Sequence, residues 1–264
     1  MIKTVILIFI ITFLSSLKAD ENNKELIESA IQNQFRKKEN ISRDIFRNPL
    51  ETLMFFGIKR DMKILEVVPG KGWYTEILSN YMKNTNNFYV AKYKKPPFAV
   101  EIINKIQNEF DTYFSENEKN FGSVQHVFIN DRFEIESDRK FDMILTFRNS
   151  HNWLGIEKGE QIYRSIYKNL KKGGILGVVQ HRANETMESN FGKGYVKESF
   201  LIKFIEEQGF KFVEKSEINS NPKDLKNYEK GVWTLPPTFR LGEKDKSKFI
   251  EIGESDRMTL KFKK

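Results

Sequence analysis

Two of the chain's three histidines stand within four residues after apolar runs that we expect to be strands. His151 comes after the run Phe141–Phe147, and His181 comes after the run Ile175–Gln180. A neutral imidazole at a strand end could act as general base toward a substrate hydroxyl or amine. We therefore take both as candidate catalytic residues, with a structural role for each as the alternative. His126 lies inside another expected strand, and we assign it to the core.

Arginine and tryptophan side chains could also take part in binding a substrate. The candidates for binding an anionic substrate or a carboxylate are Arg148, Arg182 and Arg240. The side chains that could wall an apolar pocket are Trp73, Trp153 and Trp233, although core packing is the more usual role of tryptophan.

Metal and thiol chemistry have little support in the sequence. The chain has no cysteine, which excludes disulfides, thiolate zinc sites and a cysteine nucleophile. The histidines form no short His-x-x-x-His pair, so we predict no metal site.

A glycine-rich turn links one buried strand to a helix. The apolar run Ile64–Val68 is followed by Pro69, Gly70 and Gly72, and apolar side chains then recur at helical spacing from Tyr74. Strand, glycine-rich turn and helix together open a nucleotide-binding α/β fold, and glycine lets the backbone approach a ligand closely. We expect Gly70 and Gly72 to touch a ligand, with an ordinary βα turn as the alternative.

Polar side chains accompany the strand ends. Glu66 could accept a hydrogen bond from a ligand's ammonium group or order a water, or it could bond the loop backbone instead. Asn130 and Asp131 end another strand, where an ordinary Asx turn is the alternative to ligand binding.

These residues require a scaffold, and the pattern of elements predicts one. Apolar runs near residues 64–68, 87–91, 124–129, 141–147 and 175–180 alternate with helical periodicity, and runs at 210–218 and 257–263 follow. Alternating strands and helices indicate an α/β fold, a doubly wound, mostly parallel seven-stranded sheet that ends in an antiparallel hairpin. In such sheets ligands bind beyond the carboxyl ends of the strands, at the point where the strand order reverses.

The segment between the last two strands, Asn219–Gly253, is too long for a simple link. We expect it to fold over the strand ends as a lid, with Trp233 near Trp73, His151 or His181. The alternative is a loop at the sheet edge that packs against the helix of residues 197–208.

The order of these elements resembles the class I S-adenosylmethionine-dependent methyltransferases. More narrowly, the chain is similar to a bacterial family of exported predicted methyltransferases over roughly residues 42–264. The segments that carry the likeness are Phe56-Gly57-Ile58, Pro69-Gly70-Lys71-Gly72-Trp73-Tyr74-Thr75-Glu76, Phe147-Arg148-Asn149-Ser150-His151-Asn152-Trp153, Gly231-Val232-Trp233-Thr234-Leu235-Pro236-Pro237 and Gly253-Glu254-Ser255-Asp256-Arg257-Met258.

The resemblance implies a Rossmann-like fold, S-adenosylmethionine as cofactor and methyl transfer to a small-molecule substrate. It implies a cofactor site made of Glu66, Gly70, Gly72, Asn130, Asp131 and Asn149. Two positions depart from the class pattern. Val68 stands where the class usually has a further glycine, and Lys92 stands near the strand end where it usually has an acid that binds the ribose hydroxyls. The alternative function is therefore a non-catalytic periplasmic protein that binds another ligand on the same fold.

The first nineteen residues have the pattern of a secretory signal peptide. Lys3 precedes the apolar run Thr4–Leu14, and Ala19 offers a cleavage site. We expect residues 1–19 to be removed, 20–48 to form a helical extension, and 49–264 to form the methyltransferase-like domain of a periplasmic or secreted protein. Loss of two lysines lowers the net charge from +8 to +6, and the remaining lysines are interleaved with acids. This favours a solvated surface over a nucleic-acid groove, and we expect no stable membrane span after cleavage.

Overall fold

The computed structural model describes residues 20–187 and 191–264. The expected signal peptide, residues 1–19, lies outside the described residues. No helix within the described ranges combines the length and hydrophobicity that crossing a membrane requires.

An eight-stranded sheet forms the centre of the fold, in the order β4-β3-β2-β1-β5-β6-β8-β7. The strands are β1 (Ile64–Val67), β2 (Phe88–Tyr93), β3 (Gln125–Ile129), β4 (Ile135–Glu136), β5 (Phe141–Phe147), β6 (Leu170–His181), β7 (Lys211–Ser216) and β8 (Arg257–Lys263). The pairs from β3 through β2, β1 and β5 to β6 are parallel, whereas β8 runs antiparallel to β6 and β7. The predicted doubly wound sheet with its C-terminal antiparallel strands is confirmed. The eighth strand is the two-residue β4, which is too short to show a periodic pattern.

The strand order reverses between β1 and β5, which lie side by side. All four residues of β1 and all six of β2 are buried. Full burial explains why these strands read as apolar runs, because helices cover both faces of a parallel sheet. Each apolar side chain buried in this way contributes roughly 1.5–3 kcal/mol to folding.

Helices cover the two faces of the sheet in separate groups. The described helices are residues 20–31, α2 (Lys38–Ile41), α3 (Asp44–Arg47), α4 (Pro49–Phe56), α5 (Trp73–Tyr81), α6 (Val100–Glu116), α7 (Glu118–Phe121), α8 (Ser150–Gly155), α9 (Gly159–Asn169), α10 (Glu198–Glu206) and α11 (Lys246–Ile252). One core cluster joins the sheet to the helix of residues 20–31 and to α4, α5, α6 and α7. The other joins the opposite face to α8, α9 and α10.

Helix α4 shows how local sequence fixes one of these elements. Pro49 occupies its first turn, where a missing N–H costs nothing, and Gly57 ends it in the left-handed region at φ 76°. Asn48 precedes the helix as expected, but its side chain donates to the carbonyl of Ile218 and does not cap the helix.

His126 is exposed on β3, so its assignment to the core is wrong. It shares a face with Phe128, which is also exposed, and helix α6 reaches it with the ring of Phe110 at 6.4 Å. β3 lies next to the edge of the sheet, where helix cover is incomplete.

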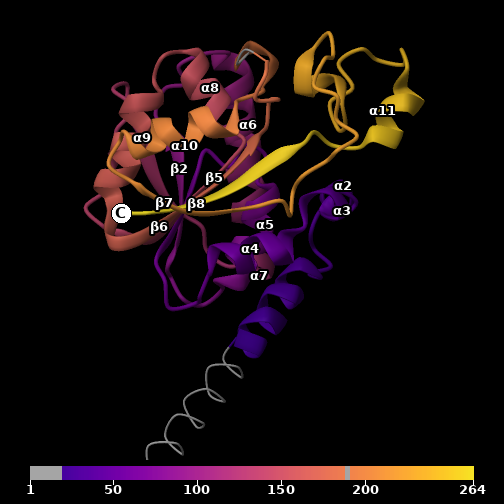
Figure 1. The fold of residues 1–264 in the computed structure, drawn as a ribbon. Helices are drawn as coiled ribbons and strands as arrows, with labels where there is room; N and C mark the ends of the chain where they lie inside the picture. The colour runs from indigo at the N-terminus through magenta and orange to yellow at the C-terminus, as the bar shows by residue number, and fades with distance from the viewer. Residues whose placement is uncertain (1–19, 188–190) are drawn as a thin grey trace, which may run out of the picture.

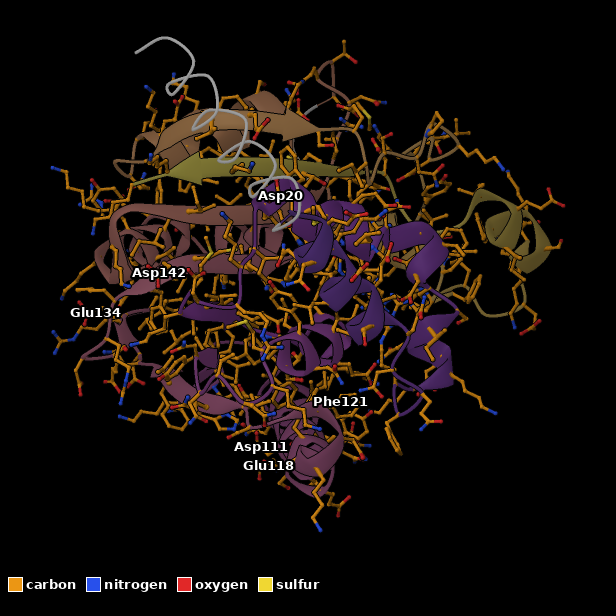
Figure 2. All side chains as sticks on the ribbon, turned by 90° about the horizontal axis from the view of Figure 1, so that it is seen from below. Asp20, Asp111, Glu118, Phe121, Glu134 and Asp142 are labelled. Carbon is orange, nitrogen blue, oxygen red and sulfur yellow. The ribbon has the colours of Figure 1, made fainter. Side chains whose placement is uncertain are left out.

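The C-terminal segment between β7 and β8 forms a lobe of its own, residues 219–256. It contains the 3-10 turn η2 (Gly231–Thr234), helix α11 and a small apolar cluster around Tyr228, Leu235 and Phe249. In Figure 1 the lobe stands to the right of the sheet, where β8 begins, beside α2 and α3. Figure 2, turned by 90°, shows the lobe on the same side of the molecule.

Candidate functional site

The turn after β1 is held in a strained, left-handed course by a side chain from β5's end. Val68, Gly70 and Gly72 all have positive φ, at 52°, 60° and 80°. A β-branched residue rarely adopts this region, so Val68 keeps it only because its surroundings impose it. The Nδ2 atom of Asn149 donates to the carbonyls of Val67 at 3.0 Å and Val68 at 3.1 Å.

A cavity of about 180 Å³ lies beyond the carboxyl ends of β1, β2 and β5. Its apolar wall comes from α6 and the loop before it, through Phe98, Ile103, Ile106 and Phe110. Its other residues are Val68, Pro69, Gly70, Lys92, Tyr93, Gln107, Asn149 and Asn152. The cavity therefore occupies the position that the strand order predicted for a ligand.

The two glycines of the turn play different roles. Gly70 lines the cavity, and a Cβ atom placed there would meet nothing within 4 Å. A Cβ atom on Gly72 would lie 2.5 Å from Cε2 of Phe114 and 3.1 Å from Cε2 of Phe110. Gly72 thus admits the close packing of α6 against the turn. Gly72 does not line this cavity, and the expectation that it touches a ligand stays a prediction.

The end of β2 carries an ion pair that the sequence did not reveal. Lys92 is buried, and its Nζ atom pairs with Asp111 on α6. Gln107, one turn earlier on α6, bonds both backbone groups of Tyr93, accepting from N at 3.0 Å and donating to O at 3.3 Å. Figure 2 labels Asp111 at the edge of the molecule away from β8. Ile103, Gln107 and Asp111 are spaced four residues apart and so lie on one face of α6. This spacing was the feature of the sequence that could have predicted the contacts of Gln107 and Asp111 with β2.

Glu66 lies beneath the turn and does not line the cavity. Its side chain is buried in β1 and accepts a hydrogen bond from the hydroxyl of Thr75 on α5 at 2.7 Å. Burial raises the pKa of Glu66 to about 8, and the bond from Thr75 opposes that shift only in part. Glu66 is therefore mostly protonated at neutral pH, and it joins β1 to α5.

Asn130 forms the Asx turn that was the alternative for this position. Its Oδ1 atom accepts from the backbone N–H groups of Arg132 and Glu134, both at 3.0 Å. This turn connects β3 to β4. The neighbouring Asp131 is exposed. The structure does not bring either residue to the cavity.

The two candidate histidines lie together, as their positions after neighbouring strands predicted. The rings of His151 and His181 are 5.5 Å apart between centroids. Nδ1 of His181 shares a hydrogen bond with the hydroxyl of Ser255 at 2.6 Å, and Nδ1 of His151 lies 3.2 Å from Nε2 of Gln180.

Both imidazoles are neutral at physiological pH. Burial lowers the pKa of His151 to about 4, with a smaller contribution from the positive charge of Arg148. Burial also lowers the pKa of His181, and the neighbouring His151 and Arg148 disfavour its protonation further. A neutral imidazole has one nitrogen that can accept a proton.

Trp233 confirms the expected position of the lid. Its ring lies 5.8 Å from the ring of His151 in an edge-on arrangement. The adjoining Val232 packs with Ala183 and Tyr195, which come after β6. The lobe of residues 219–256 therefore reaches the strand ends and does not pack as an edge loop on α10.

The three candidate arginines have different surroundings. Arg182 is neutralised by ion pairs to Glu198, Glu217 and Asp256. Arg240 lies over the ring of Trp233 at 4.6 Å. Arg148, at φ 64° after β5, makes no side-chain hydrogen bond or ion pair with any residue in the described ranges. Within the same ranges, no group of three or more potential ligands could hold a metal ion.

Solved structures share this architecture at low sequence identity. The sequence matches no family profile and no curated protein. A SAM-dependent methyltransferase from Aquifex aeolicus superposes with a TM-score of 0.53 at 17% identity, covering 67% of this chain and 87% of that one. The protein has the fold of the S-adenosylmethionine-dependent methyltransferases.

Two further neighbours show the range of chemistry on this fold. The glycopeptide N-methyltransferase MtfA, complexed with S-adenosyl-L-homocysteine, matches with a TM-score of 0.52 at 13% identity, covering 87% of this chain and 90% of that one. The [4+2]-cyclase SpnF matches with a TM-score of 0.54 at 15% identity, covering 88% of this chain and 84% of that one. Since a cyclase shares the fold, the reaction has to be argued from the site.

Proposed function

We propose that the protein is an exported S-adenosylmethionine-dependent methyltransferase that acts on a small molecule. The observation that carries this proposal is the cavity beyond β1, β2 and β5. It lies where the strand order reverses, the backbone of Gly70 is open to it, and its wall is apolar. Methyltransferase neighbours with the same fold were crystallised with the cofactor or its product.

The cavity fits the cofactor in two respects. An aromatic and aliphatic wall suits the adenine ring, and Phe98 and Phe110 supply its aromatic part. The Nδ2 atom of Asn149 donates to the carbonyls of the turn and to the hydroxyl of Thr146. Its Oδ1 atom has no partner among the described residues. An amide oxygen of this kind can accept a hydrogen bond from an ammonium group.

The residues beyond the cavity would serve the methyl acceptor. The cofactor supplies a methyl group on a sulfonium, which leaves readily, so the protein mainly has to align the acceptor. His151 or His181, as a neutral imidazole, would take the proton that an acceptor hydroxyl or amine releases. Trp233 would exclude water from that side.

Export rests on the basic start, the apolar run and Ala19 of the first nineteen residues. Mass spectrometry of the native protein tests it. A mature chain that begins at Asp20 is expected, and an intact Met1 on a cytoplasmic species would contradict export.

One observation favours a second function, a periplasmic binding protein that captures another ligand without catalysis. Lys92 and Asp111 neutralise each other beside the cavity, where the class has a free acid, and a lysine cannot accept a bond from ribose hydroxyls. The charged cofactor is also made inside the cell, whereas the protein is proposed to leave it.

Isotope transfer separates the two functions. The purified protein is incubated with S-adenosylmethionine labelled at the methyl group and with extracts of small molecules from the source cells. Label that moves to a small molecule supports the methyltransferase. The matched control is Gly70→Val, which fills the open side of the turn. Binding of a small molecule with no transfer of label in either protein would support the binding protein instead.

A further inference from the structure

Four arginines gather where the N-terminal segment, the end of β5 and the start of β8 meet. We call Arg43, Arg47, Arg148 and Arg257 the arginine cluster. Three of them surround one carboxylate, that of Glu254 in the C-terminal lobe. The Nε atoms of Arg43 and Arg47 lie 2.6 Å and 3.1 Å from its two oxygens, and Nη1 of Arg257 lies 3.0 Å away.

The arginine cluster carries more positive charge than its surroundings neutralise. Within residues 20–187 and 191–264, Glu254 is the carboxylate that forms ion pairs with Arg43, Arg47 and Arg257, and Arg148 has no ion pair. Four guanidinium groups therefore share one carboxylate. Burial raises the pKa of Glu254, but the arginines outweigh it and hold that pKa far below its usual range.

Burial and the positive charge of Arg148 lower the pKa of Arg47 well below its usual range, so the excess positive charge is felt inside the cluster. Burial lowers the pKa of Arg148 to about 10, Glu254 opposes that shift, and the charges of Arg43 and Arg257 reinforce it. At neutral pH Arg148 remains protonated. Four cations that share one buried carboxylate are costly, so this arrangement calls for a second anion.

Several hydrogen-bond donors of the cluster point to no acceptor. Nη2 of Arg43, Nη2 of Arg47 and Nε of Arg257 are buried without a partner in the described part of the chain. Arg47 is 2% exposed and Arg257 is 3% exposed, so bulk water does not solvate them. Their guanidinium forks have the geometry that binds an oxyanion through parallel N–H bonds.

A purely structural role explains part of the cluster. Glu254 joins the lobe to the N-terminal segment through Arg43 and Arg47, and Arg257 adds a bond to the carbonyl of Phe46. Ordered water could satisfy the free N–H groups, but it would not neutralise the charge. Neither explanation accounts for Arg148, whose side chain makes no hydrogen bond or ion pair in the described part of the chain.

We propose that the arginine cluster binds a small oxyanion, the carboxylate or phosphate group of a small molecule. Arg148 is adjacent to Asn149, which lines the cavity, so the oxyanion would lie on the same rim of the sheet. His151 and His181 are near enough to Arg148 for its charge to lower the pKa of both, and both are uncharged. That the oxyanion belongs to the methyl acceptor rests on the proposed function, whereas its binding does not.

Thermal unfolding of the purified protein tests the proposal without any cofactor. Sodium phosphate and sodium acetate are titrated at pH 7, each against sodium chloride of equal ionic strength. A ligand that binds the folded state raises Tm as its concentration passes Kd. We expect phosphate or acetate to raise Tm beyond chloride, and the more effective of the two identifies the charged group.

Two substitutions at Arg148 and one control complete the test. Arg148→Gln leaves the packing of the chain intact because no partner is lost, and the affinity for the effective anion should fall about tenfold or more. Arg148→Lys keeps the charge without the fork and should bind with intermediate affinity. The control Arg132→Gln removes an exposed arginine between β3 and β4 and should bind like the wild type.

The proposal is overturned if phosphate and acetate stabilise the wild type no more than chloride does. It is also overturned if Arg148→Gln and Arg132→Gln respond alike. Binding of S-adenosylmethionine without binding of either anion would contradict this inference and leave the proposed function standing. Binding of an anion without binding of S-adenosylmethionine would support this inference and contradict the proposed function.

Discussion

The side-chain amide of Asn149 donates to the carbonyl of Val68 at 3.1 Å and so ties the end of β5 to the strained turn after β1. Because both residues also line the cavity, one hydrogen bond shapes the site and supports the fold. The residue before it, Arg148, belongs to the arginine cluster. The end of β5 is therefore the point where the cavity and the proposed oxyanion site meet.

Asn149→Ala should loosen the turn. It removes the bonds to Val67, Val68 and Thr146, and the free energy of unfolding should fall by about 1–3 kcal/mol because buried carbonyls lose their donor. Ligand affinity should fall with it. Urea unfolding measures the first effect, and the exposed Asn108→Ala on α6 is the control. Equal stability of the two variants would show that this amide does not hold the turn.

Gly70→Ala and Gly72→Ala form a matched pair, since both glycines have positive φ and both substitutions carry the same backbone strain of about 1 kcal/mol. Gly72→Ala should cost more stability, because its Cβ would press on the ring of Phe114. Gly70→Ala should lose no more stability than this strain costs, and it should lose ligand affinity because Gly70 lines the cavity. A Gly72→Ala variant that is more stable than Gly70→Ala would contradict the close packing of α6 against Gly72.

Glu66 should make the protein less stable as pH rises. The unfolded chain releases this proton near its ordinary pKa of 4.5, and the folded chain holds it until about 8. The stability due to the protonated side chain is therefore complete below pH 4.5 and is lost as pH rises toward 8, by at most roughly 1.4 kcal/mol per pH unit. Glu66→Gln should remove this slope, whereas the exposed Glu101→Gln should keep it. Urea unfolding between pH 5 and 8 provides the comparison, and parallel pH profiles for all three proteins would refute a neutral Glu66.

Trp233→Ala should weaken ligand binding more than it weakens folding. The indole is only partly buried and contacts His151 at the strand ends, so its removal opens the lid while the core remains intact. We expect affinity to fall about tenfold or more, equivalent to about 1.4 kcal/mol, with a smaller change in the free energy of unfolding. Leu241→Ala, in the apolar cluster of the lobe, is the control for a general loss of lobe stability.

The sequence predicted what depends on local pattern. Buried apolar runs such as Ile64–Val67 predicted the strands near their observed bounds. Pro49 at the first turn and Gly57 after the last residue predicted the bounds of helix α4. The order of the elements placed His151 and His181 side by side, because both follow strands that end at the same edge of the sheet. Trp233 was placed correctly by a similar argument, since its segment was too long to serve only as a link.

The remaining features depend on tertiary packing that no local pattern encodes. Gly72 faces Phe114 only because α6 lies across the turn, and the exposure of His126 follows from incomplete cover at the sheet edge. The arginine cluster draws on segments more than two hundred residues apart, such as Arg43 and Glu254 at 2.6 Å. Because these residues are so far apart in the sequence, the excess of positive charge at the cluster can be recognised only in the folded structure.

Calorimetric titration with S-adenosylmethionine tests the central claim, that the cavity beyond β1, β2 and β5 binds this cofactor. The purified protein, Gly70→Val and Arg132→Gln are titrated under the same conditions. The account predicts saturable binding near one equivalent for the wild type and Arg132→Gln, and loss of binding for a folded Gly70→Val. No heat of binding for the wild type, or equal binding by Gly70→Val, would contradict it.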